Sequence, residues 1–189
     1  MPPSNAYGQE LAVVTVTYSP GATLDTFLDS VVKATSRPLR VLLVDNGSTD
    51  GAPERAVRRD GVQLLRIGEN VGYGSAANRG VVEWGPEGGW VVVANPEIEW
   101  HPGSLDELLE AARRWPRAGA LGPLIRQPDA TVYPSARLLP ALGRGIGHAI
   151  LGSIWSGNPW TTAYRQSDTA LGERTAQWLS GSCLLFRPA

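Results

Sequence analysis

Cysteine is almost absent from this chain of 189 residues, in which Cys183 is the single example. One cysteine excludes an internal disulfide, and the N-terminal residues lack the basic and apolar regions of a secretion signal. Both absences favour a reducing, cytoplasmic location. The sequence also lacks an apolar run of about eighteen residues, which argues against a membrane-spanning helix but leaves a peripheral contact with a membrane open.

An excess of charge of either sign is missing too. The 17 Lys and Arg side chains are balanced by 18 Asp and Glu, for a net charge of -1. Without a positive field the chain has no general means of gripping a phosphate backbone, so we expect no nucleic-acid partner. The length and the hydrophobic content of 42% are typical of a globular protein with one sizeable core. They predict a single domain over residues 1–189.

Apolar runs rich in β-branched residues alternate along the chain with segments of helical periodicity. We predict strands at 11–18, 39–44, 62–67, 90–95 and 183–187. We predict helices after an N-cap at Thr23, over 53–59, within 70–84 and over 105–115, and an irregular hairpin within 121–139. The alternation implies βαβ crossovers, a mostly parallel sheet in the α/β class, and ligand binding outside the carboxyl ends of the strands.

Polar clusters follow three of these strands, at 17–19, 45–50 and 95–97. In a parallel sheet such strand ends lie at the same edge. Turn formation alone also explains the second cluster, because Ser48 or Thr49 could cap the next helix. A carboxylate at this edge could accept the imide N–H of a uracil or thymine ring, and hydroxyl or backbone N–H groups could hold ribose or phosphate.

The succession VVTVTY, VLLVDNGSTDG, ENVGYGSAANRG, VVVANPE and WLSGSCLLFR, spread over 11–187, resembles the family 2 glycosyltransferases with the GT-A fold. That resemblance implies a Rossmann-like, mostly parallel sheet flanked by helices. Within the family the motifs are similar to those of bacterial rhamnosyltransferases, which transfer rhamnose from dTDP-rhamnose to a lipid-linked GlcNAc or a polysaccharide acceptor in cell-envelope synthesis. It therefore implies an inverting, metal-dependent transferase acting in the cytoplasm or at the inner face of the plasma membrane.

The resemblance also implies roles for individual residues. It assigns nucleotide-sugar binding to Thr17, Tyr18, Asp45, Asn46, Asn70, Gly72, Asn78, Arg79 and Asn95. Asp45 would meet the base. Glu97 stands where the family has the last Asp of its metal motif, and it would hold Mg²⁺ or Mn²⁺ against the diphosphate, although it could also be a solvated carboxylate. Trp178, Ser180 and Gly181 correspond to the acceptor side, for which a plain strand entry is the alternative.

Two departures from the family pattern bear on activity. The family continues with a Gly-Gly-Phe segment and an acidic pair that supplies the base for the acceptor hydroxyl, so the catalytic base is expected beyond Ala189 in a C-terminally truncated chain. A catalytically incomplete nucleotide-sugar-binding fragment or pseudoenzyme is therefore an alternative function. The usual Tyr-Asn after the first strand is also replaced, since Ser19 stands in the place of Asn.

Other features carry less weight. The spacing of Gly72, Gly74 and Ala77 matches a dinucleotide fingerprint, but it follows the third strand rather than the first, so an NAD-dependent enzyme is the weaker alternative. Cys183 is expected to be a buried apolar residue. The segment 138–164, rich in Gly, Pro and Trp, is expected to form either a membrane-facing flap or a loop that covers the core.

Overall fold

A computed structural model describes residues 11–84, 89–137 and 172–187. The chain falls into two compact units. The first contains Met1–Leu121 and Gly181–Ala189, and the second contains Gly122–Ser180.

The first unit is built on a six-stranded sheet. In spatial order its strands are β3 (Val62–Arg66), β2 (Leu39–Asp45), β1 (Leu11–Thr17), β4 (Trp90–Ala94), β10 (Cys183–Phe186) and β5 (Ala120–Leu121). The first four are parallel, and β10 runs antiparallel to both β4 and β5. These pairings confirm the predicted mostly parallel α/β sheet. The prediction was possible because apolar runs buried on both faces are typical of strands joined by crossover helices.

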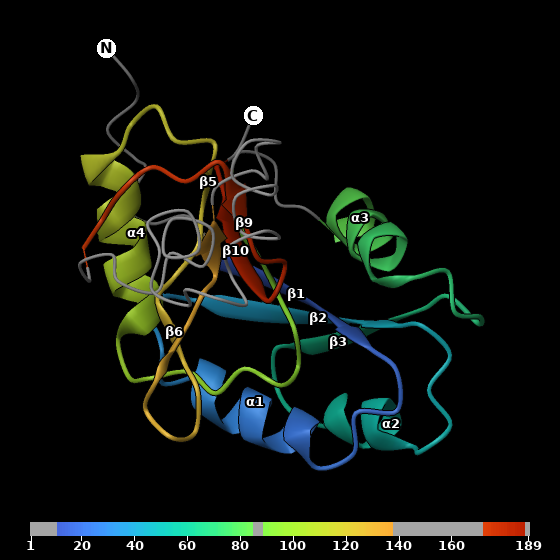
Figure 1. Ribbon diagram of the computed structural model, residues 1–189. Coiled ribbons are helices and arrows are strands. Elements are labelled where there is room, and N and C mark those ends of the chain that lie inside the picture. The colour runs from blue at the N-terminus through green and yellow to red at the C-terminus, as the bar shows by residue number, and fades with distance from the viewer. Residues whose placement is uncertain (1–10, 85–88, 138–171, 188–189) are drawn as a thin grey trace, which may run out of the picture. The chain divides into compact units, whose positions relative to one another are not determined.

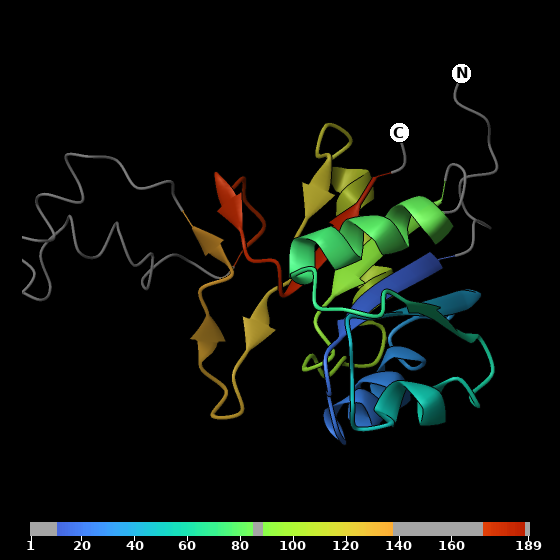
Figure 2. The same ribbon diagram turned by 90° about the vertical axis from the view of Figure 1, so that its right-hand side faces the viewer.

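In the described part of the chain these strands are accompanied by four helices, namely α1 (Thr23–Val31), α2 (Ala52–Ala56), α3 (Tyr73–Trp84) and α4 (Ser104–Arg114). Helix α3 lies on one face of the sheet, and α1 and α2 lie on the other (Figures 1 and 2). The predicted helices are present, but the cap at Thr23 is wrong. Ala22 occupies the N-cap position, and the Thr23 hydroxyl donates instead to the Pro20 carbonyl at 2.6 Å.

Helix α3 packs closely on β1 and β2 through its small residues. Ala76 and Ala77 belong to a buried apolar cluster with the valines of β1, β2 and β4. At Gly80 the approach is so close that an added Cβ atom would lie 2.5 Å from a methyl group of Val44 and 2.8 Å from one of Val14. This close packing sets the position of the Gly-rich loop that precedes the helix.

Within its described residues, 122–137 and 172–180, the second unit contains two pairs of short antiparallel strands. In the first pair β6 (Ile125–Arg126) lies beside β7 (Val132–Tyr133), which confirms the hairpin predicted within 121–139. In the second pair β8 (Ala136–Arg137) lies beside β9 (Trp178–Leu179). The segment 138–164, for which a flap or covering loop was expected, lies outside the described residues.

Among the described helices, none combines the length and the apolar character that a membrane crossing requires.

Candidate functional site

The carboxyl ends of β1, β2 and β4 meet at one edge of the sheet. Thr17 lies beside Asp45 in the β1–β2 register, and Ala94, the last residue of β4, pairs with Thr15. Strands β1 and β4 are neighbours in the sheet. From β1 the chain continues to β2 on one side of this pair, and from β4 it continues to β5 on the other side. Such a reversal of strand order is the position at which open α/β sheets bind ligands.

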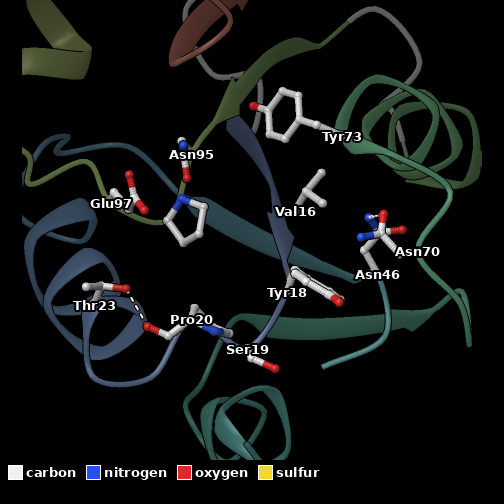
Figure 3. A pocket seen from close by; sticks show the side chains of 11 residues that line it. Val16, Tyr18, Ser19, Pro20, Thr23, Asn46, Asn70, Tyr73, Asn95 and Glu97 are labelled. Carbon is white, nitrogen blue, oxygen red and sulfur yellow. Dashed lines mark hydrogen bonds between the residues drawn. The ribbon is translucent and has the colours of Figure 1, made fainter. Parts of the chain in front are cut away.

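A hollow of about 400 Å³ lies at this edge. Its lining residues are Val16, Tyr18, Ser19, Pro20, Thr23, Asn46, Asn70, Tyr73, Asn95, Pro96 and Glu97. Asn46 and Asn70 lie on one side and Asn95 and Glu97 on the other, with Val16 and Tyr18 between them (Figure 3). Tyr18 is 62% exposed, so its aromatic side chain can contact a ligand.

Asp45 is buried at the end of β2 and does not line the hollow. It is 4% exposed, and its Oδ1 atom accepts hydrogen bonds from the Ser48 amide at 2.9 Å and from the Thr17 hydroxyl at 3.4 Å. Within the described part of the chain its Oδ2 atom has only Arg66 Nη1, at 3.9 Å, and that guanidinium donates to Glu54 at 2.6 Å. One carboxylate oxygen therefore shapes the turn, and the other keeps capacity to accept a further bond.

The loops after β1 and β2 are joined by side-chain hydrogen bonds. The Ser48 hydroxyl accepts from the Ser19 amide at 2.9 Å, and the Ser19 hydroxyl accepts from the Thr49 amide at 3.0 Å. Neither Ser48 nor Thr49 caps α2, whose N-cap is Gly51, so that interpretation is wrong. Ser19 has φ 50, a left-handed conformation that Asn tolerates better than Ser.

Asn46 holds the Gly-rich loop before α3. Its Nδ2 group donates to Asn70 Oδ1 at 2.9 Å, and its Oδ1 atom accepts from the Val71 amide at 2.9 Å. Asn70 Oδ1 also accepts from the Gly72 amide at 3.0 Å. These backbone donors determine which way both amides face, because each oxygen must meet an N–H group. Asn46, which is 3% exposed, thus serves as a clasp for the loop.

Tyr73, the first residue of α3, was given no role in the sequence analysis. Its hydroxyl donates to the Gly181 carbonyl at 3.0 Å, a contact across 108 positions of the chain. The adjacent Ser182 carbonyl accepts from the Asn95 amide at 2.8 Å. Burial, with a further contribution from Cys183, raises the pKa of Tyr73 to about 12. The spacing of the Gly-rich motif does not indicate that Tyr73 contacts Gly181. Only tertiary packing brings these two residues together.

Glu97 and Asn95 are the oxygen donors that stand together at the other end of the hollow (Figure 3). Within the described residues no group of three or more His, Cys, Asp or Glu side chains gathers to form a protein-only metal site. One carboxylate and one amide suit a hard divalent cation only if a ligand's own oxygens and water complete the coordination. The residues therefore fit a cation carried by a diphosphate, and they do not form a cage for a free one.

Several predicted site residues lie elsewhere. Asn78 and Arg79 line a second hollow of about 410 Å³ with Arg66 and Glu83, and neither they nor Gly72 line the first. Trp178 and Ser180 belong to the second unit, whereas Gly181 belongs to the first. Cys183 is buried, as expected, and burial raises the pKa of its thiol to about 12.

Comparisons with known proteins find similarities of family, sequence and fold. The model of glycosyl transferase family 2 matches residues 12–175. An N-acetylglucosaminyl-diphospho-decaprenol L-rhamnosyltransferase of Mycobacterium tuberculosis (strain ATCC 25618 / H37Rv) is 58% identical over 187 residues, which cover 94% of this chain and 61% of the relative. This chain thus spans less than two thirds of the length of that relative.

Two solved structures share the fold. A mannosyltransferase from Pyrobaculum calidifontis in complex with GDP-Man and Mn²⁺ is 26% identical with a TM-score of 0.52, over 65% of this chain and 37% of that one. Glucosyl-3-phosphoglycerate synthase from Mycobacterium tuberculosis in complex with uridine-diphosphate is 15% identical with a TM-score of 0.55, over 96% of this chain and 57% of that one.

Proposed function

Because the chain belongs to glycosyl transferase family 2, we propose that it provides the donor-binding part of a rhamnosyltransferase that moves L-rhamnose from dTDP-rhamnose to a lipid-linked GlcNAc. The observation that carries the proposal is the identity of 58% over 187 residues with a transferase of that name. The hollow at the ends of β1, β2 and β4 supports it, because its volume and polar lining suit a nucleotide sugar.

The nucleoside would occupy the side of the hollow formed by Tyr18, Asn46 and Asn70. Tyr18 presents its exposed ring to the base or the ribose. Asp45 Oδ2, which keeps capacity to accept, would take the imide N–H of thymine from beneath this side. The diphosphate would then extend across Val16 toward Asn95 and Glu97.

Glu97 would hold Mg²⁺ or Mn²⁺ at the diphosphate. When bound, such a cation would supply positive charge to offset the negative charge that the nucleotide gains as the anomeric C–O bond breaks. The complex of the related mannosyltransferase with GDP-Man and Mn²⁺ supports a divalent ion. The side chain of Glu reaches one methylene further than that of Asp, and its exposure leaves it free to adjust to the diphosphate.

The acceptor hydroxyl would attack from the side of Gly181 and Ser182, opposite to the leaving nucleotide, which inverts the anomeric centre. The base that removes its proton is proposed to lie beyond Ala189. A lipid-linked acceptor resides in a membrane, so we further propose that the reaction takes place at the inner face of the plasma membrane, with a peripheral contact of the protein.

Calorimetric titration with dTDP tests the donor site. Asp45→Asn keeps an acceptor for the Ser48 amide at Oδ1 and thereby places an NH₂ group at the Oδ2 position. That group opposes the thymine N3–H but can donate to cytosine N3. We expect dTDP binding to weaken by roughly ten- to a hundredfold and dCDP binding to strengthen, given the worth of a hydrogen bond to a charged group. Equal losses for both nucleotides would contradict the role of Asp45.

The metal role is tested with and without Mn²⁺. Glu97→Ala is expected to remove the increase in dTDP affinity that Mn²⁺ causes and to leave metal-free affinity unchanged. Glu99→Ala is the matched control, because this exposed acid lies two residues away and does not line the hollow. Binding without transfer by the wild-type chain would favour the incomplete fragment, and binding of NAD instead of dTDP would favour the dinucleotide alternative.

A further inference from the structure

The turn at Gly181 and Ser182 is tied to the donor hollow through both of its carbonyl groups. The Gly181 carbonyl accepts from the Tyr73 hydroxyl at 3.0 Å, and the Ser182 carbonyl accepts from the Asn95 amide at 2.8 Å. Tyr73 and Asn95 both line the hollow. If a bound nucleotide sugar displaced either residue, the turn would move with it through these hydrogen bonds. The turn itself contributes no residue to the lining of the hollow.

A second set of contacts connects Tyr73 to the nucleoside side of the hollow. Asn46 holds Asn70 and the Val71 amide, and Asn70 holds the Gly72 amide. Tyr73 follows directly and begins α3. The position from which its side chain projects is therefore fixed by the clasp at the end of β2.

The Tyr73 hydroxyl is suited to act as a constant donor. A tyrosine hydroxyl ordinarily keeps its proton at physiological pH, and the raised pKa of Tyr73, about 12 mainly because of burial, extends that range further. The ring packs beside Gly181, where an added Cβ would lie 3.7 Å from the ring Cε1 atom, an ordinary contact distance. Gly181 is not among the residues with positive φ, so its backbone does not require glycine. The absence of a side chain keeps the space beside the carbonyl open.

We propose that Tyr73 is a positioning residue for the acceptor, because its hydroxyl holds the turn at Gly181 and Ser182 beside the donor hollow. This inference rests on the proposed glycosyl transfer. In this proposal the side chain of Tyr73 connects the Gly-rich loop, which would contact the nucleotide, to the turn at Gly181 and Ser182, which the acceptor would approach.

The first test measures the turn directly by hydrogen exchange. Tyr73→Phe keeps the ring and removes only the donor, so the amides of residues 181–184 should exchange roughly two- to tenfold faster, as the loss of one neutral hydrogen bond predicts. Tyr133→Phe, which removes the same atom from β7 of the other unit, is the control and should leave the exchange of those amides unchanged. Unchanged exchange in Tyr73→Phe would overturn the proposal.

The second test separates donor from acceptor binding. With saturating dTDP and Mn²⁺, the Kd of a short-chain prenyl-diphosphate-linked GlcNAc should rise roughly two- to tenfold in Tyr73→Phe, while the Kd of dTDP stays within about twofold. Equal weakening of both ligands would mean that the hydroxyl contacts the nucleotide, and it would overturn the proposal. Gly181→Ala should keep the slow amide exchange of the turn, since the hydrogen bond from the Tyr73 hydroxyl survives. It should weaken binding of the acceptor, because the added methyl group fills the open space beside the carbonyl.

The two tests also distinguish this inference from the proposed function. A wild-type chain that binds neither dTDP nor the acceptor would refute the glycosyl-transfer proposal, and hydrogen exchange would still decide whether Tyr73 holds the turn.

Discussion

Asn46→Asp replaces one nitrogen by oxygen in the clasp that holds the Gly-rich loop. The new carboxylate still accepts from the Val71 amide, but its second oxygen faces Asn70 Oδ1 across 2.9 Å, where Nδ2 donated before. Loss of that hydrogen bond costs about 1 kcal/mol, and two opposed acceptors at a site only 3% exposed add about 1–3 kcal/mol. We expect the free energy of unfolding to fall by about 2–4 kcal/mol.

The partner of this contact offers a matched control. Asn70→Asp adds the same charge to the lining of the same hollow, but its oxygen already accepts from both Asn46 Nδ2 and the Gly72 amide. Asn70 is an exposed residue, so water can solvate the second oxygen of the new carboxylate. The free energy of unfolding should therefore change by less than about 1 kcal/mol. Urea denaturation of both variants, with dTDP titration beside it, separates the loss of the clasp from the effect of added charge.

The pH dependence sharpens the same prediction. Burial and the facing Asn70 oxygen raise the folded-state pKa of the introduced carboxyl above its unfolded value, and the protonated form can donate to Asn70 again. The deficit of Asn46→Asp should therefore be small at low pH and grow as pH rises through the folded pKa. Equal destabilisation of the Asn46 and Asn70 variants, or a deficit independent of pH, would refute the clasp.

Two further predictions concern the scaffold around the hollow. Gly80→Ala places a Cβ within 2.8 Å of methyl groups of the sheet, so overpacking of about 1–3 kcal/mol should outweigh the helical gain and lower the urea midpoint. Gly74→Ala, on the same helix with nothing within 4 Å, should instead stabilise by up to about 1 kcal/mol, and a reversed order would contradict the packing. At Asp50 desolvation raises the pKa of the carboxyl, but hydrogen bonds from the amides of Ala52 and Gly21 lower it, and the net shift is downward. The ionised carboxylate therefore stabilises the folded protein at neutral pH, and this stabilisation is lost as pH falls through the folded-state pKa. The difference in unfolding free energy between wild type and Asp50→Asn should thus shrink from pH 7 to pH 3, and a constant difference would contradict it.

Much of the fold could be predicted because its determinants are local. The β-branched runs at 11–18 and 39–44 became β1 and β2, and the polar residues after them meet at one edge, as the parallel arrangement requires. Errors occurred where two local interpretations compete. Thr23 has the chemistry of an N-cap, but its hydroxyl turns to the Pro20 carbonyl and Ala22 takes the cap position.

The individual site roles were harder to predict, because the residue types do not say which partner a side chain meets. Asn46 was expected at the nucleotide, and it lines the hollow with its amide bonded to the loop. Asp45 is buried behind the lining, and Asn78 and Arg79 line a separate hollow with Arg66. Each outcome depends on the direction in which a side chain leaves its element, which the motif spacing does not contain.

The sequence by itself determined the class of fold, the family, and the edge of the sheet at which a ligand binds, because hydrophobic periodicity and turn chemistry act over a few residues. Tertiary structure alone decided which partner each side chain at that edge contacts. It placed the Asn46 clasp on the Gly-rich loop and joined Tyr73 to a carbonyl 108 positions away. Both contacts join residues that are distant in the sequence and meet only when strands and α3 pack together, so no local pattern encodes them.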